Sequence, residues 1–202
     1  MLIIHTYKFI FIKTKKTAGT SIEIELSKIM SEDDIVTPIK PSHPDHKPRN
    51  YIYKGHKLFN HITLSDLKKI FPKEIINNYF KFCVEREPVD KCISDFSMYK
   101  NSEYHNKDNI TWDSYIRNGN FPIDTNKYTD EKNQLCVDKI FKFEKLNEEL
   151  IKTTKLLGIN FNGLNIRAKS GFRENIKITE KEKEIIYRAF SLSNKLTGYK
   201  IY

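Results

Sequence analysis

Six residues near the start of the chain have the composition of an anion-binding loop: Lys16-Thr17-Ala18-Gly19-Thr20-Ser21. The residues before them, 7–12, are almost all apolar, which is typical of a strand buried on both faces. The residues after them place Ile22, Leu26 and Ile29 at helical spacing. Such a loop can bind an anion, because the first turn of the following helix offers unpaired N–H groups and the positive end of the helix dipole. The Lys16 ammonium adds a full charge, and the hydroxyls of the loop add hydrogen-bond donors.

The loop differs from the one that binds nucleoside triphosphates. That loop has the pattern G-x-x-x-x-G-K-[ST], whereas here Lys16 precedes Gly19. The sequence therefore disfavours a P-loop kinase. Ala18 is small enough to let the backbone approach a phosphate, provided that its φ angle is negative. The alternative interpretation is an ordinary surface turn with incidental lysines.

A second group of polar residues follows another nearly apolar run. Arg86 comes directly after this run, and Pro88 stands where a helix is expected to begin. Ser94 then lies about 9 Å along the helix axis. An arginine at a strand end can bind a phosphate through two parallel hydrogen bonds, which lysine cannot reproduce. The alternative is an ion pair between Arg86 and either Glu85 or Glu87.

The hydrophobic pattern predicts the elements that position these residues. Strands are expected at 7–13, 79–85 and 135–143, and residues 1–4 are expected to form an edge strand or an arm. Helices are expected at 19–30, 63–71, 111–118 and 144–157, from 88 onwards and from 179 to about 196, and residues 119–133 are expected to form a loop. The alternation predicts an α/β fold with a parallel sheet flanked by helices. Because ligands of such sheets bind beyond the carboxyl ends of the strands, the loops after Ile12, after Val84 and near Lys169 are expected to share one crevice.

The composition limits the class of protein. A chain of 202 residues fits one domain, 1–202, and 39% hydrophobic with 30% charged residues indicates a globular rather than a disordered chain. The net charge of +9 indicates an anionic partner such as a nucleotide, a nucleic acid, an acidic glycan or a membrane surface. We find no apolar segment typical of a membrane span or a signal peptide, and Cys83, Cys92 and Cys136 lack metal-site spacing. Free thiols and a cytoplasmic location are therefore expected.

Together, the two groups of residues resemble the motifs of sulfotransferases that use 3′-phosphoadenosine 5′-phosphosulfate (PAPS). The loop that begins at Lys16 is similar to P-K-T-G-G-T-S, with Lys15 in place of the proline and Ala18 in place of the first glycine. The segment that begins at Arg86 is similar to R-x-P-x-x-R-x-x-S, with Lys91 where a second arginine often lies. The resemblance spans most of the chain and is to bacterial-type enzymes related to the carbohydrate 2-O-sulfotransferases.

The resemblance implies a sulfotransferase fold, with a P-loop-like sheet, and a role for each motif. Residues Thr17, Ala18, Gly19, Thr20 and Ser21 would hold the 5′-phosphate, and Lys16 would offset the charge that grows during transfer. Arg86 and Ser94 would hold the 3′-phosphate. A late basic segment would reach the 3′-phosphate or the adenine through Lys169, Ser170 and Arg173. No metal and no nucleic acid are implied; the acceptor would be a hydroxyl on a carbohydrate, in a cleft shaped by 31–50 and 101–133.

Sulfuryl transfer to an alcohol also needs a base, and histidine suits that role at neutral pH. Of the six histidines, His56 and His61 lie between the two motifs, where the family places its base. Asn60-His61 directly precedes a capped helix and resembles the base segment of bacterial relatives. Gly55-His56 resembles a Gly-His pair of the carbohydrate enzymes. We favour His61 as the catalytic base and keep His56 as the alternative; either could instead be a hydrogen-bonded loop residue.

A different class of function fits the same charge. A basic module without catalytic activity could bind a nucleotide or a nucleic acid. Nucleic-acid binding would weaken steeply with salt, whereas a PAPS site would bind 3′,5′-ADP (PAP) saturably and would discriminate against 5′-AMP. The sequence leaves the identity of the acceptor and the oligomeric state open.

Overall fold

The central element is a five-stranded mixed sheet, seen in a computed structural model that describes residues 1–105, 109–166, 168 and 171–200. Its strands are β1 (Leu2–Ile4), β2 (Phe9–Ile12), β3 (Ile35–Val36), β6 (Phe80–Glu85) and β7 (Lys139–Lys142), in the spatial order β3-β1-β2-β6-β7. Strands β2, β6 and β7 are parallel to one another, whereas β1 runs antiparallel to both β2 and β3. The prediction of an α/β fold with parallel strands is confirmed for β2, β6 and β7 at the centre of the sheet, and β1 is the strand that runs antiparallel to its neighbours.

The first strand is not at the edge of the sheet. Residues 2–4 pair with Phe9–Phe11 on one side, and Leu2 and Ile3 pair with Ile35–Val36 on the other. All three side chains are fully buried. This three-residue apolar segment is therefore an interior strand. Its hairpin with β2 places it where apolar side chains pack on both faces of the sheet.

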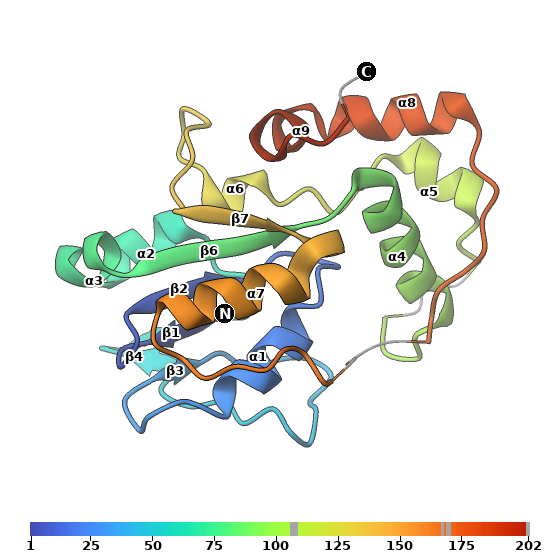
Figure 1. Cartoon of the computed structure of the whole chain (residues 1–202). Coiled ribbons are helices and arrows are strands. Elements are labelled where there is room, and N and C mark those ends of the chain that lie inside the picture. The colour runs from blue at the N-terminus through green and yellow to red at the C-terminus, as the bar shows by residue number, and fades with distance from the viewer. Residues whose placement is uncertain (106–108, 167, 169–170, 201–202) are drawn as a thin grey trace.

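Two apolar clusters cover the two faces of the sheet. One face packs against α1 (Gly19–Ser27) and α7 (Leu146–Leu156), through Ile22, Leu26, Leu146 and Leu150. The other face packs against residues of α2 (Leu64–Ile70), α3 (Lys73–Asn78) and α6 (Thr125–Tyr128). In Figure 1, α1 and α7 lie in front of the strands, and α2, α3 and α6 lie behind and above them.

A third cluster lies beyond the carboxyl end of β6. It joins α4 (Pro88–Asn101), α5 (Trp112–Asn118) and α8 (Glu180–Ala189), and α9 (Ser191–Thr197) follows directly. The single last helix expected from the sequence is divided, because the backbone of Phe190 has a ψ angle of 16° and leaves the helical range. In Figure 1 the arrow of β6 leads into α4, with α5 and α8 beside it.

The remaining elements are short. Strands β4 (Ile52–Tyr53) and β5 (His56–Lys57) form a separate two-stranded hairpin, and a short helix, η1 (Phe143–Lys145), precedes α7. The predicted loop 119–133 contains α6. No helix among the described residues is both long and apolar enough to cross a membrane.

Candidate functional site

The loop after β2 turns through two left-handed residues before α1 begins. Lys16 has a φ angle of 61° and Ala18 one of 58°. The expectation of a negative φ at Ala18 is therefore wrong. Ala18 is the N-cap residue of α1, and its side chain caps no backbone group. The N–H groups of the first turn of α1 thus have neither an acceptor in the helix nor a side-chain cap, which is the arrangement that binds anions.

The hydroxyls of the loop do not all serve the same purpose. Thr17 is fully buried, and its Oγ1 donates to the Thr14 carbonyl at 3.2 Å and lies 2.9 Å from Thr14 Oγ1. Its hydroxyl therefore holds the loop together. Thr20 Oγ1 instead accepts from Lys13 Nζ at 3.1 Å, and Ser21 Oγ accepts from Ala168 N at 3.0 Å. Each of these two oxygens keeps its own proton for donation to an anion.

Lys13 is a part of the loop that sequence reasoning missed. Its side chain passes beneath the loop and is almost fully buried, with Nζ 2.5 Å from Glu23 Oε2. Burial lowers the pKa of Lys13, although Glu23 opposes this shift. A lysine at the end of an apolar strand, ten residues before a glutamate on the next helix, is the signal that could have identified the pair.

The second motif reaches the loop directly. Arg86 Nη1 donates to the Lys16 carbonyl oxygen at 3.1 Å, and its guanidinium carbon lies 4.1 Å from the centroid of the Phe143 ring. Arg86 Nε also forms an ion pair with Asp90, one helical turn along α4. Neither Glu85 nor Glu87, the two partners considered from the sequence, forms this ion pair with Arg86. The parallel pairing of β2 and β6 brings the two loops to the same edge of the sheet, as expected.

The late basic segment joins the same group of residues. Arg173 Nη2 pairs with the second oxygen of Asp90, so one carboxylate lies between Arg86 and Arg173. Ser94 is half-buried on α4. The predicted Lys169 and Ser170 lie outside the described residues.

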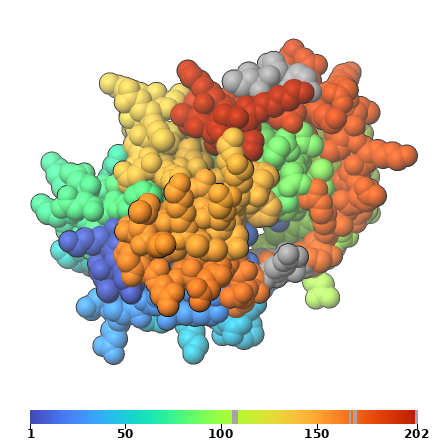
Figure 2. Space-filling view, in the orientation of Figure 1, coloured from blue at the N-terminus to red at the C-terminus, as the bar shows by residue number. Residues whose placement is uncertain are grey.

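Two backbone contacts fix the path of this segment across the crevice. Ala168 is held to α1 through Ser21, and the Phe172 carbonyl accepts from Asn101 Nδ2 of α4 at 2.9 Å. Ala168 therefore lies against α1, and Phe172 lies against the C-terminal end of α4. Figure 2 shows the surface hollowed between the orange atoms of α7 and the green atoms of α4.

His61 lies against the end of β2. Its Nδ1 is 3.0 Å from the Lys13 carbonyl oxygen. A carbonyl only accepts, so Nδ1 carries the proton and Nε2 keeps its lone pair. Burial lowers the pKa of His61 from 6.5 to about 3, and the positive charges of Lys127 and Lys13 add to that effect. The imidazole is therefore a neutral base with its free nitrogen available.

His56 has a different environment. It is exposed in β5, where its backbone pairs with Tyr53 in the small hairpin. No contact described in the structure joins it to the loop after β2 or to Arg86. The geometry brings His61, but not His56, to the predicted crevice.

A buried ion-pair network supports the loop from behind. Asp124 accepts from the backbone N–H of Lys15 at 2.6 Å and from Lys91 Nζ at 3.0 Å, and it forms an ion pair with Lys127. Lys91 Nζ also lies 2.8 Å from Glu85 Oε2. Lys91 and Asp124 are fully buried, so Lys91 is not placed to meet a phosphate as the second arginine of the motif would be. Burial, with the nearby charges of Lys15 and Lys91, lowers the pKa of Lys127 to about 7.

Sequence reasoning missed this network because it placed 119–133 in a loop.

The three cysteines were expected to carry free thiols. Cys83 and Cys92 are buried and Cys136 is half-buried, and all three are free. Burial raises the pKa of Cys83 and Cys92, which keeps both thiols protonated. No cluster of three or more potential metal ligands occurs within 1–105, 109–166, 168 and 171–200.

The chain is similar to other proteins in sequence and in structure. No protein-family model matches the chain. An alignment 95 residues long, with 28% identity, covers 43% of this chain and 74% of an uncharacterized protein of Archaeoglobus fulgidus. The crystal structure of mouse sulfotransferase SULT7A1 complexed with PAP aligns with a TM-score of 0.45 and 17% identity over 79% of this chain. The aligned region is 62% of the mouse chain, so this chain spans less than two thirds of its length.

Proposed function

We propose that the protein is a sulfotransferase that moves a sulfuryl group from PAPS to an acceptor hydroxyl. The observation that carries the proposal is the 3.1 Å hydrogen bond from Arg86 to the Lys16 carbonyl. It supports a single site in which two anion-binding elements, one after each of two neighbouring parallel strands, adjoin. A nucleotide with phosphates at both its 3′ and 5′ positions presents two anions to such a pair.

The donor groups fit the two ends of this nucleotide. The N–H groups at the start of α1, the hydroxyls of Thr20 and Ser21 and the Lys16 ammonium would hold the 5′ end. Arg86, Arg173 and Ser94 would hold the 3′-phosphate. The Asp90 carboxylate already pairs with both guanidiniums, which supports the presence of an oxyanion position between them. Lys169 and Ser170 stay proposals that rest on the resemblance of their segment alone.

In the proposed reaction, one side chain of this protein accepts a proton from the acceptor. PAPS supplies a sulfuryl group whose sulfur bonds to the acceptor oxygen as its bond to the 5′-phosphate oxygen breaks, which releases PAP. His61 Nε2 takes the proton of the acceptor hydroxyl. A base with a pKa of about 3 is weak, but an anion bound at the loop would offset the positive charges of Lys127 and Lys13 that help to lower it. Lys16 would offset the charge on the departing phosphate oxygen.

Titration of the purified protein with PAP and with 5′-AMP tests the proposal. A ligand that binds the native state raises the apparent melting temperature by mass action. We expect PAP to raise it at lower concentration than 5′-AMP, and unlabelled PAPS with a suitable acceptor to yield PAP. Equal responses to the two nucleotides would overturn the proposal. A response to single-stranded DNA alone, lost steeply with salt, would favour the basic nucleic-acid module instead.

A further inference from the structure

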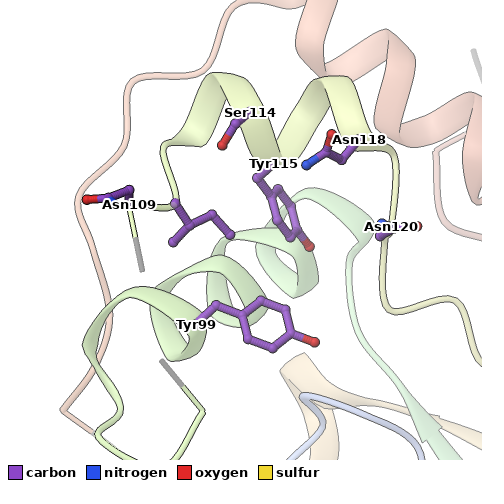
Figure 3. A pocket seen from close by; sticks show the side chains of 7 residues that line it. Tyr99, Asn109, Ser114, Tyr115, Asn118 and Asn120 are labelled. Atoms are coloured by element: carbon purple, nitrogen blue, oxygen red, sulfur yellow. The ribbon is translucent and has the colours of Figure 1, made fainter. Parts of the chain in front are cut away.

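A cavity of about 240 Å³ opens between α4 and α5, apart from the proposed nucleotide site. Two tyrosines line it, and Figure 3 shows Tyr115 extending from α5 toward α4, above the ring of Tyr99. Its other lining residues are Ile110, Ser114 and the asparagines at 109, 118 and 120. Tyr115 is buried, whereas the three asparagines are exposed around it. The cavity thus has an aromatic floor and a rim of amides.

The lining has a particular chemistry. None of the seven lining residues carries a charge, although the chain as a whole has a net charge of +9. Amide and hydroxyl groups both donate and accept hydrogen bonds, and the tyrosine rings offer apolar faces. A ligand with alternating hydroxyls and C–H faces would satisfy both kinds of group. A phosphate or a sulfate would meet no cation among these residues.

A buried acid behind the floor also disfavours an anionic ligand. Tyr115 Oη donates to Asp95 Oδ2 at 3.2 Å, and Asp95 is 2% exposed. Burial raises the pKa of both Tyr115 and Tyr99, and the charge of Asp95 raises both further. Both phenols are therefore neutral at physiological pH. The negative charge of Asp95 behind the floor repels an anion and leaves a neutral ligand unaffected.

One helix, α4, connects this cavity to the proposed site. Lys16 Nζ lies 3.2 Å from Met98 Sδ, and Tyr99 is the next residue of α4. The same helix carries Ser94 and follows Arg86. Because consecutive residues of a helix rise by about 1.5 Å, the cavity and the Lys16 ammonium flank the same turn of α4.

We propose that this cavity binds the acceptor, and that the unit it takes is a neutral, hydroxyl-rich ring of the size of one hexose. The proposal rests on the proposed function and names the acceptor's chemistry. The volume equals that of about eight waters at about 30 Å³ each, which suits one such ring with its hydroxyls. Tyr99 and Tyr115 would stack on the ring faces, and Ser114, Asn118 and Asn120 would bind its hydroxyls.

The test is an NMR titration of the isotope-labelled full chain, with and without PAP. The probes are the methyl glycosides of glucose, galactose and N-acetylglucosamine, with glucuronic acid and phenol for comparison. We expect at least one neutral glycoside to shift the side-chain amide signals of Asn118 and Asn120. Asn118→Asp should weaken that binding about fivefold, because it replaces two donors with a charge. Asn160→Asp, the same change at an exposed position outside the cavity, should leave it unchanged.

The outcomes separate this inference from the proposed function. If PAP binds but no neutral glycoside shifts the two amides, or if glucuronic acid or phenol binds more tightly, the inference is wrong and the donor site stands. If a neutral glycoside binds as expected but PAP does not, the cavity is a carbohydrate site and the sulfotransferase proposal fails. Equal effects of Asn118→Asp and Asn160→Asp would also overturn the inference.

Discussion

The Arg86 guanidinium donates a 3.1 Å hydrogen bond to the carbonyl of Lys16, and this contact joins the ends of two parallel strands into one site. The same guanidinium stacks on Phe143 and pairs with Asp90, so its plane is fixed on three sides. A planar fork held in this way can meet a phosphate with little loss of freedom.

Arg86→Lys should therefore weaken PAP binding about tenfold or more, because lysine keeps the charge but cannot bind two oxygens in one plane. Binding of 5′-AMP, which has no 3′-phosphate, should change much less. Isothermal titration with both nucleotides measures the difference. Arg188→Lys, a change in an exposed arginine paired with Glu184 on α8, is the matched control. Equal losses for the two nucleotides would contradict the assignment of Arg86 to the 3′-phosphate.

Asp90 lies where a 3′-phosphate would have to bind. Its carboxylate pairs with Arg86 and Arg173, so an incoming phosphate must compete with it for both guanidiniums. Asp90→Asn removes the competing charge with little change of shape, and we expect it to tighten PAP binding several-fold. The pair is partly exposed, which keeps the effect modest. Weaker PAP binding in the variant would mean that Asp90 orients the two arginines rather than competing with the ligand.

The backbone of the loop after β2 predicts opposite effects on stability for substitutions at Gly19 and at Ala18. A Cβ on Gly19 would lie 2.7 Å from Lys13 Cγ and 2.8 Å from Lys13 Cε, and that side chain is held by Glu23 and Thr20. Gly19→Ala should therefore cost about 1–3 kcal/mol of stability. Ala18→Gly should instead add about 1 kcal/mol, because it relieves a left-handed backbone at a residue with a Cβ. Urea unfolding of the two variants measures both; destabilisation by Ala18→Gly would contradict the assigned backbone.

The elements that sequence reasoning predicted correctly were those with strong local signals. Pro88 marked the start of α4, and the capping box Thr179-Glu180-Lys181-Glu182 marked the start of α8. The apolar runs located β2 and β6, and hence the shared edge of the sheet. Each of these signals lies within a few residues of the feature it predicts.

The misses depend on contacts between residues far apart in the sequence. Asp124 is 109 residues from Lys15, and nothing near it indicates that it holds the backbone of the loop. Lys91 fitted a phosphate motif by spacing but is buried against Glu85 and Asp124. Glu23 is a charged residue of α1, yet it is fully buried and paired with Lys13. Burial of paired charges is set by tertiary packing and leaves no periodic pattern.

His61 gives a prediction that needs neither substrate nor nucleotide. Its pKa is about 3 in the native state and 6.5 in the unfolded chain, so between these values the unfolded state binds more protons. The contribution of His61 to the free energy of unfolding should then fall as the pH is lowered through this window and be constant above pH 6.5. From pH 7.5 to pH 5 the loss is about 2 kcal/mol. His61→Gln removes the titrating group and keeps a donor for the Lys13 carbonyl. Between pH 7.5 and pH 5 this variant should therefore lose about 2 kcal/mol less of its free energy of unfolding than the wild-type protein.

Urea unfolding at the two pH values, with His56→Gln as a matched control, isolates the contribution of His61. His56 is exposed on its hairpin, so its replacement should leave the pH dependence of the wild-type protein unchanged.

Bound PAP should also change the pKa of His61. Its phosphates would offset the charges of Lys13 and Lys127 that help to lower the pKa of His61, so saturating PAP should raise that pKa in an NMR titration of the imidazole. An unchanged His61 pKa with PAP bound would place the nucleotide away from His61 and would remove this residue as the base.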